Sequence, residues 1–309
     1  MFLTPVSGVA TTRLNSPISR RRDLRRQMTG LLFVSPFLVV FICFYVVPII
    51  IGFHLALYVS SFGINHFVWF RNFETVFTDP NFYRGLLTVL LFGVIQVPVM
   101  VLFALLIAFV LNSPLIKGKK IFRFLVFLPY AVPGVISALL WGYLYTPGIS
   151  PLVGTARDLG LSGFTFLGPS VILLSIMNIV VWEWTGYNSV IFHSSLQAQP
   201  LELEEAATIE GAKWIQVVTR IKLPLLMPTV FLVLMFSVVG TLQLFNEPFI
   251  MATMTSLPYA YTPNMYIYNE AFTFGNLNYA AALSFVLALF TFAASFLLMR
   301  YALPRRQRS

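Results

Sequence analysis

Six apolar stretches, each long enough to cross a membrane, divide this chain of 309 residues. A helix needs about 20 apolar residues to cross a hydrocarbon core about 30 Å thick. Lipid offers the backbone no hydrogen-bond partners, so stretches of this length are expected to be helical. The sequence therefore predicts an all-α integral membrane protein with six transmembrane helices, at residues 30–53, 85–111, 124–145, 170–194, 225–245 and 279–299.

Composition argues against the two alternatives of a membrane barrel and a soluble domain. Barrel strands would be about 10 residues long with alternating apolar and polar side chains, and these stretches are neither. A soluble core of this size would need more polar residues to cover it. Here 58% of residues are hydrophobic and only 10% are charged.

The formal charge of +9 is distributed unevenly along the chain. With a cytoplasmic N-terminus, 17 of the 20 Lys and Arg residues lie on inner segments, and the outer loops hold only Arg71, Arg84 and Arg157. The positive-inside rule then places both termini in the cytoplasm. We expect a basic N-terminal tail at 1–28, a six-helix domain at 29–303 and a basic C-terminal tail at 304–309. The charge suits insertion and an anionic inner leaflet rather than nucleic acid.

The Arg-rich segment at 20–26, followed by an apolar run, resembles a secretory signal peptide. The run is longer than usual and has no clear small-residue cleavage site, which favours an uncleaved first helix. The single Cys43 excludes a disulfide within the chain and a thiolate metal site. Because His54, His66 and His193 are far apart in the sequence, we predict no metal site.

Prolines occur in the predicted spans and in the outer loops. Pro129 and Pro133 lie in the third span, where each removes a backbone donor. We expect packing kinks there rather than hinges, since neighbouring helices can satisfy the freed carbonyl groups. The outer loop at 246–278 is rich in Pro and Tyr and suits a short re-entrant or interfacial helix. No internal repeat indicates a duplicated transporter.

Residues 195–228 form a charged segment between two apolar stretches, which we call the elbow. Pro200 suits the first turn of a helix, and the acidic residues at 202–205 complement its positive end. Gly211 is free to adopt the positive φ that ends such a helix. A second helix at 213–222 then leads into the fifth span. The pattern predicts a stiff helical bracket, and an ordinary loop of helix-promoting composition is the alternative.

The elbow resembles the cytoplasmic EAA loop of ABC-importer membrane subunits, the helix pair that docks on the ATPase. Glu210 stands where the sugar-importer branch usually has Asp. Segments 182–200 and 266–282 are also similar to carbohydrate-type permeases, so the resemblance covers about residues 28–303. The positions that match the EAA motif are Glu205, Ala206, Ala207, Gly211, Ile221, Leu223 and Pro224.

Two departures from the family pattern are visible. The Gly-Gly-Pro usual after the fifth span is absent, and 253–258 stands in its place. The C-terminus lacks the Gly-rich tail typical of the second permease of a pair. The chain therefore resembles the first-permease type of maltose and glycerol-phosphate importers.

The resemblance implies a type I ABC importer permease fold with a cytoplasmic coupling helix between the fourth and fifth spans. It implies four partners in a bacterial or archaeal cell membrane: a second homologous permease, a cytoplasmic ATPase dimer, an extracytoplasmic solute-binding protein and a sugar. No phosphate-binding loop occurs in the sequence, and neither does a catalytic triad or a metal cluster. The chain is thus expected to be no enzyme and to bind no cofactor, with ATP and Mg held by the partner ATPase.

In family members the fourth and fifth spans line the translocation path. Aromatic faces stack on sugar rings and amides satisfy sugar hydroxyls, so residues of these types at matching positions are the predicted substrate path. Charges within spans are costly, and Glu183 is expected to hold a helix contact. The substrate-path residues are Trp184, Tyr187, Asn188, Gln243, Phe245 and Asn246.

These observations favour the transmembrane subunit of an ATP-driven importer for a sugar or oligosaccharide, working by alternating access. The nearer alternative is an importer permease for another solute, such as glycerol phosphate, a polyamine or a peptide. A secondary transporter is less favoured. It would need more spans or an internal repeat, with ionisable residues deep in several spans.

Overall fold

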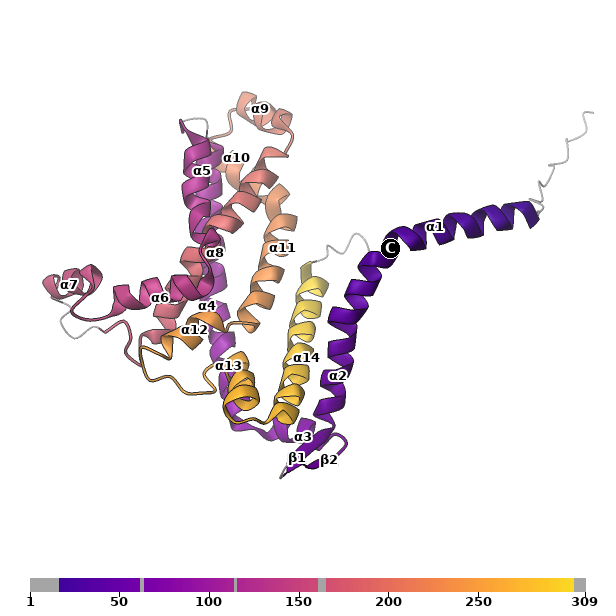
Figure 1. Ribbon diagram of the computed structural model, residues 1–309. Coiled ribbons are helices and arrows are strands. Elements are labelled where there is room, and N and C mark those ends of the chain that lie inside the picture. The colour runs from indigo at the N-terminus through magenta and orange to yellow at the C-terminus, as the bar shows by residue number, and fades with distance from the viewer. Residues whose placement is uncertain (1–16, 62–63, 114–115, 161–164, 303–309) are drawn as a thin grey trace, which may run out of the picture. The chain divides into compact units, whose positions relative to one another are not determined.

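A computed structural model describes residues 17–61, 64–113, 116–160 and 165–302. The chain separates into two units, Met1–His54 and Leu55–Ser309, and each is described by itself. Figure 1 labels the elements that follow. In chain order they are α1 Pro17–Phe41, η1 Ile42–Val46, α2 Val47–Ala56, β1 Tyr58–Ser61, β2 Ile64–Phe67, α3 Arg71–Thr78, α4 Pro80–Asn112, α5 Lys119–Phe127, η2 Leu128–Ala131, α6 Gly134–Tyr145, α7 Pro151–Asp158, α8 Ile172–Gln197, α9 Leu201–Ile209, α10 Trp214–Val217, η3 Val218–Lys222, α11 Leu223–Leu242, α12 Asn246–Met251, α13 Pro263–Tyr268, η4 Asn269–Thr273 and α14 Leu277–Ala302.

The described part of the first unit belongs to one continuous helical run, α1, η1 and α2, whose last residue, Ala56, already belongs to the second unit. Its apolar part, Met28–Ala56, is long enough to cross a membrane and confirms the first predicted helix. Helix α1 already begins at Pro17, inside the segment that we expected to be a tail. Residues 1–16 and 303–309 lie outside the described residues, and with them most of both predicted tails.

The second unit opens with an antiparallel hairpin of β1 and β2, in which Tyr58 pairs with Phe67 and Ser61 with Ile64. The paired Tyr58 and Phe67 rings meet edge to face at 5.1 Å. The all-α prediction is wrong at this point, because the aromatic and β-branched side chains of this short connection pair well across strands.

Helices α4, α8 and α11 form the centre of the second unit. One buried cluster, with Phe82, Phe92 and Ile176, lies toward the start of α4. A second, with Ala104 and Phe192, lies toward its end. Several polar residues of α8, among them Glu183, Asn188 and His193, are buried among these helices, so this part of α8 is packed by protein.

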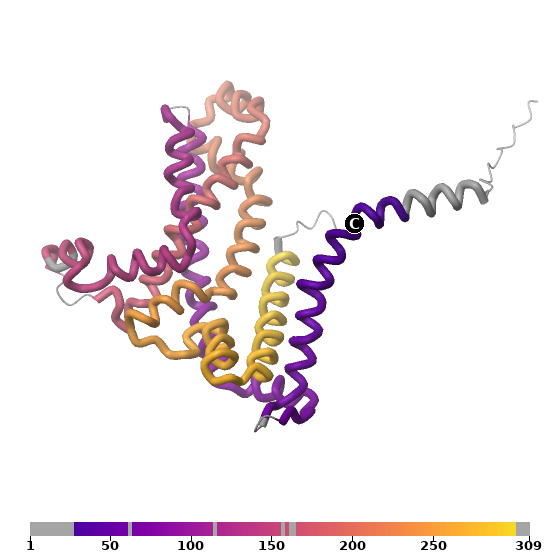
Figure 2. The backbone as a smooth tube through the Cα atoms, viewed as in Figure 1, coloured from indigo at the N-terminus to yellow at the C-terminus, as the bar shows by residue number. Residues whose placement is uncertain are grey.

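The third predicted span is broken rather than kinked. Helices α5 and α6 meet at 93° across residues 132–133, as the backbone trace in Figure 2 shows. Pro129 begins the short helix η2, and Pro133 precedes α6. Val132 takes an extended conformation with ψ 126°, as a residue before proline favours. The prediction of one helix at 124–145 with packing kinks is therefore wrong.

Among the described residues, four helical runs are long and apolar enough to cross a membrane, or five if the bent pair α5–α6 counts as one. They confirm the positions of most predicted spans. Helix α8 occupies the fourth predicted span with 26 residues but is not among these runs. Its polar residues, Glu183 and His193 included, lower its hydropathy. The total of six spans stays a prediction.

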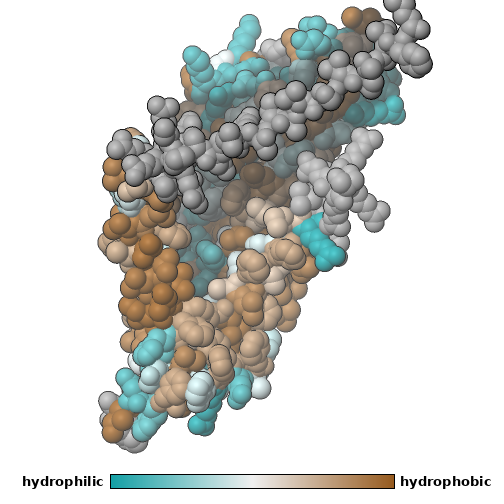
Figure 3. Space-filling model, turned by 90° about the vertical axis from the view of Figure 1, so that its right-hand side faces the viewer, coloured by the Kyte–Doolittle hydropathy of each residue, from teal (hydrophilic) through white to brown (hydrophobic). Residues whose placement is uncertain are grey.

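Within the second unit, α9 and α10 lie at one end, while the hairpin, α3 and α13 lie at the opposite end (Figure 1). The segment predicted to contain a short outer helix holds α12 and α13. In Figure 3, hydrophobic residues cover the middle of the face shown and hydrophilic residues gather toward its ends, the pattern of a membrane-embedded surface.

Candidate functional site

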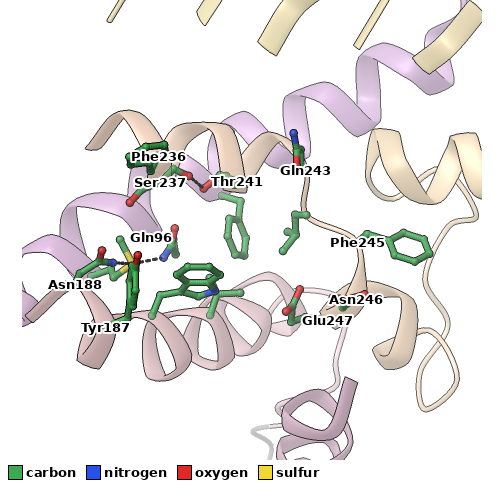
Figure 4. Close-up of a pocket in the computed structure, with 16 residues that line it drawn as sticks. Gln96, Tyr187, Asn188, Phe236, Ser237, Thr241, Gln243, Phe245, Asn246 and Glu247 are labelled. Carbon is green, nitrogen blue, oxygen red and sulfur yellow. Dashed lines mark hydrogen bonds between the residues drawn. The ribbon is translucent and has the colours of Figure 1, made fainter. Parts of the chain in front are cut away.

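A cavity of about 340 Å³ opens between α4, α8, α11 and the segment that enters α12. Helices α4 and α8 pack closely along this region, and α11 closes the third side. Figure 4 shows the lining side chains converging from these elements. The lining consists of Phe92, Gln96, Met100, Val180, Trp184, Tyr187, Asn188, Phe236, Ser237, Gly240, Thr241, Gln243, Leu244, Phe245, Asn246 and Glu247.

Two amides are fixed at one end of the cavity by the same sulfur atom. The side chains of Gln96 and Asn188 each donate a hydrogen bond to Met100 Sδ at 3.4 Å (Figure 4). Sulfur is a weak acceptor, so both amides retain capacity for stronger partners such as hydroxyl groups. Gln96 is only 2% exposed, which makes its orientation well defined.

Aromatic rings form the adjoining wall. Tyr187 stacks on Tyr130 of η2 at 4.4 Å with an angle of 23° between the rings. Trp184 meets both tyrosines edge to face, at 5.2 Å from Tyr130 and 5.9 Å from Tyr187. At the other side of the cavity, Phe245 stacks on Phe249 at 4.9 Å. Such rings present flat apolar faces with fixed orientation.

An acidic pair borders the cavity where α6, α8 and α12 meet. Glu247 lines the cavity, and Glu183 interacts with it from α8. Both are buried, at 4% exposure for Glu183 and 7% for Glu247. The Glu183 Oε1 atom has no hydrogen-bond partner within the described part of the chain. None of the described residues that line the cavity is basic.

All six residues of the predicted substrate path line this one cavity. Their part in transport is a proposal, taken up below. The sequence reasoning missed Gln96, Met100, Ser237 and Thr241, and it did not assign Glu247 to the path. A polar side chain within an apolar span is the signal that marks Gln96 and, more weakly, Ser237 and Thr241.

The elbow folds as two short helices joined at a glycine. Helix α9 is followed by Gly211, whose φ of +84° is the left-handed conformation that the sequence predicts there. The Ala212 amide donates to the Ala207 carbonyl at 2.9 Å, which closes the helix end. Pro200 does not occupy the first helical turn as expected. It precedes α9 in an extended conformation with ψ 124°.

The second elbow helix is shorter than predicted. Helix α10 covers only Trp214–Val217, and a wider π turn, η3, continues it to Lys222. Leu223 and Pro224 then begin α11 without a gap. The elbow is thus continuous with a span, in the way the sequence predicts.

Most of the elbow surface is exposed. In α9, which is described in full, no residue is buried. Large apolar side chains are among the exposed ones, with Ile209 at 87% and Trp214 at 63%. Apolar side chains gathered outside the apolar span indicate an interaction surface. The matched motif residues Glu205, Ala206 and Gly211 are exposed on this surface as well.

The fold and the cavity define a polytopic helical membrane protein whose helices enclose a cavity lined by aromatic and polar side chains. The sequence profile of the family described as "binding-protein-dependent transport system inner membrane component" matches residues 100–309. The chain belongs to this family, and the resemblance stated from the elbow is confirmed. It is a multi-pass inner-membrane component of a transport system and not an enzyme.

Curated relatives cover nearly the whole chain. The lactose transport system permease protein LacF of Rhizobium radiobacter is 30% identical over 93% of this chain and 98% of that protein. The probable ABC transporter permease protein YurN of Bacillus subtilis is 32% identical over 87% and 94%. The sn-glycerol-3-phosphate permease UgpA of Agrobacterium fabrum is 30% identical over 89% and 94%.

Solved structures agree on the fold. A chain of a bacterial ABC transporter involved in the import of the acidic polysaccharide alginate matches with a TM-score of 0.80, over 94% of this chain and 100% of that one, at 22% identity. A second structure of the alginate transporter, in complex with a pentasaccharide-bound periplasmic protein, matches with a TM-score of 0.76, over 92% and 96% of the two chains.

Proposed function

We propose that this chain is the first-type permease subunit of an ATP-driven importer that takes up an uncharged sugar or oligosaccharide. The observation that carries the substrate assignment is the cavity. Aromatic faces and amide groups of the six path residues surround one space in the helix bundle. Relatives named for lactose and for arabinooligosaccharides agree with it.

The charges at the cavity favour an uncharged sugar over an anionic solute such as glycerol phosphate. Anions are bound in proteins by Arg, Lys or helix N-termini, and the described lining residues supply no basic side chain. Glu247 adds an acidic group at the wall, which would repel a phosphate or a uronate.

The proposed topology has six spans and both termini in the cytoplasm. The four apolar runs, the bent pair α5–α6 and α8 would supply the six crossings. Basic residues concentrate on the segments that this topology places inside, at the α4–α5 connection and on the elbow. In Figure 1 the start of α5 and the elbow helix α9 lie at the same end of the second unit.

The elbow is the proposed docking site for the partner ATPase. Its exposed apolar side chains and its direct continuation into α11 suit a lever that passes motion to a span. ATP and Mg would be held by the ATPase, and a second permease would complete the translocation path. An extracytoplasmic binding protein would deliver the sugar, as the alginate complex with its periplasmic protein suggests.

Retention of the ATPase tests the docking. A tagged chain isolated from its native host in mild detergent is expected to carry an ATPase, and Gly211→Pro is expected to lose it. Proline fixes φ near −65° and cannot adopt +84°, so the α9–α10 turn has to change. Gly148→Pro is the matched control, because Gly148 also has positive φ, at +87°, but lies between α6 and α7. An ATPase that stays bound to folded Gly211→Pro contradicts the proposed docking site.

Uptake into proteoliposomes tests the substrate class. The purified complex with its binding protein is offered lactose, maltose and an arabinooligosaccharide, and against them glycerol 3-phosphate and an alginate oligosaccharide. We expect uptake of a neutral sugar only. Tyr187→Ala should lower that uptake about tenfold, the equivalent of roughly 1.4 kcal/mol. Tyr143→Ala on α6, outside the cavity, should leave it unchanged. Uptake of the anionic solutes alone would contradict the assignment.

A further inference from the structure

A side-chain ion pair joins the exposed helix of the elbow to the start of a span. Lys222 Nζ lies 2.7 Å from Glu204 Oε2. Glu204 is on α9, and Lys222 is the last residue of η3, directly before α11. The Lys222 side chain is largely buried, while that of Glu204 is partly exposed. The contact therefore spans the inner side of the elbow, facing away from its exposed surface.

A second contact fixes the same point from the other direction. The Gln199 side chain donates to the Lys222 carbonyl at 3.0 Å. Gln199 lies between the end of α8 and the start of α9, so three elements meet at Lys222. These groups line a space of about 320 Å³ beside α9, so this side of the helix is not filled by close-packed side chains.

Helix α9 has few other attachments within the described residues. None of its residues is buried. At one end α9 follows Pro200, which is in an extended conformation, and at the other it is followed by the left-handed Gly211, where backbone torsions can change easily. Without a cross-link, a force on α9 would rotate it about these ends rather than move α11.

Lys222 also occupies the position from which α11 is best moved. It ends a π turn, and such turns are frequent at functional sites because their wider hydrogen-bonding pattern allows local shifts. Residues beyond it are in continuous helix as far as Leu242. Ser237 and Gly240, near the end of that helix, line the cavity.

We infer that the Glu204–Lys222 pair is a strut that makes α9 and α11 move as one body, so that motion of the docked ATPase reaches the cavity wall. Glu204 and Lys222 are positioning residues in this scheme, and neither contacts the substrate. The inference rests on the proposed function and adds to it a specific side-chain link between docking and opening.

The test measures cavity opening in the intact complex. Cys43, the one cysteine of the chain, is replaced by Ser, and Gly240→Cys places a probe on the cavity wall. A side chain at Gly240 meets no atom within 4 Å, so the probe fits. The complex with its ATPase, in nanodiscs, is labelled with a membrane-impermeant maleimide with and without ATP, and labelling of this chain is read by mass.

We expect ATP to change the labelling rate at least about fivefold when the strut is intact, in the range of ordinary coupling between two sites. Glu204→Gln and Lys222→Gln should each reduce that change to less than about twofold while the ATPase stays bound. The exchanged pair, Glu204→Lys with Lys222→Glu, should restore it. Glu202→Gln, an exposed acid on the same helix, is the matched control and should behave as the unsubstituted chain.

Three results would overturn the strut. The first is that the single variants keep the full change. The second is that they release the ATPase, which would make the pair part of the docking surface. The third is that the exchanged pair fails to rescue them. Failure of the unsubstituted chain to retain an ATPase would instead contradict the proposed function. The two failures are therefore distinguishable in one experiment.

Discussion

Single residues set how closely the helices of this protein approach one another. At Gly186 on α8, an added Cβ would lie 1.8 Å from the Val126 carbonyl oxygen of α5. No side-chain rotation can relieve a contact with backbone at that distance. The close packing beneath the cavity, which brings Tyr187 next to η2, therefore requires glycine at the preceding position.

We predict that Gly186→Ala destabilises the protein. Helices α5 and α8 must separate to admit the methyl group, at a cost of about 1–3 kcal/mol, typical for overpacking. Thermal unfolding in detergent, followed by circular dichroism, measures the change. Gly240→Ala is the control, since its Cβ meets nothing within 4 Å and alanine is the better helix former by about 1 kcal/mol. Equal stability of the two variants would contradict the packing argument.

Asp79 is a second residue with a local task, at the start of α4. Its carboxylate accepts hydrogen bonds from the Tyr279 hydroxyl at 2.7 Å, the Tyr266 hydroxyl at 2.5 Å and the Asn81 amide at 2.8 Å. Partial burial alone would raise the pKa of this carboxyl. The hydrogen bonds from Tyr266, Tyr279 and the backbone together outweigh burial and lower the pKa below its ordinary value of 3.8.

A lowered native pKa gives stability that is fully present above pH 3.8 and is lost as pH falls through the native value. We predict that the wild type unfolds at a higher temperature than Asp79→Asn at pH 7, and that the gap narrows as pH falls below 3.8 and through the lowered native pKa. Asparagine still caps a helix well, so the substitution keeps the cap while it removes the charge and one of the two acceptor oxygens. A gap that persists unchanged at pH 3 would show that shape rather than charge matters.

At the scale of elements, the buried acidic pair stands out because it joins α8 to α12 without a described positive partner. Two buried carboxyl groups repel when both are charged. We predict that Glu183→Gln, which keeps the shape and removes one charge, unfolds at the same temperature as the wild type or higher. Glu183→Ala should unfold at a lower temperature, because it leaves a cavity. Scanning calorimetry of both variants and the wild type measures the three unfolding temperatures. A Gln variant as weak as the Ala variant would mean that the charge itself stabilises the contact.

Elements that depend on residues close together in the sequence could be predicted, and those that depend on contacts between distant segments of the chain could not. The positive φ at Gly211 and the run of the elbow into α11 follow from residue types at short spacing. The predicted path residues were chosen as aromatic and amide side chains at positions that match the family, and the structure places all six at one cavity. Gln96 was missed because only the packing of α4 against α8 brings it to the same cavity.

The broken helix α5–α6 shows the same division. Pro129 and Pro133 indicate that the helix is interrupted, but proline alone does not determine the angle between the two parts. A lipid-facing helix would bend and continue. Here Glu247 of α12 packs beside Gly134 of α6. A Cβ added at Gly134 would lie 3.1 Å from the Glu247 carboxylate, so α12 fills the space next to α6. The 93° turn is thus decided by residues more than a hundred positions away.

At the scale of the whole molecule, the proposed topology determines which side of the membrane each end of the second unit faces. We predict that a cysteine at Ile209 on α9 is labelled only from the cytoplasmic side of sealed membrane vesicles, and one at Ile64 in β2 only from the outer side. Both side chains are exposed, and the two elements lie at opposite ends of the second unit. The Cys43→Ser background removes the native thiol. Labelling of both positions from one side would contradict the six-span topology.

The turn between α5 and α6 has a further consequence. An unbroken third helix would present its aromatic residues one above another along the side of a single helix. The interruption instead places Tyr130 on the short helix η2, where its ring stacks on that of Tyr187. By giving up a straight helix, the chain gains a stacked pair of rings that fixes the orientation of Tyr187 at the cavity wall.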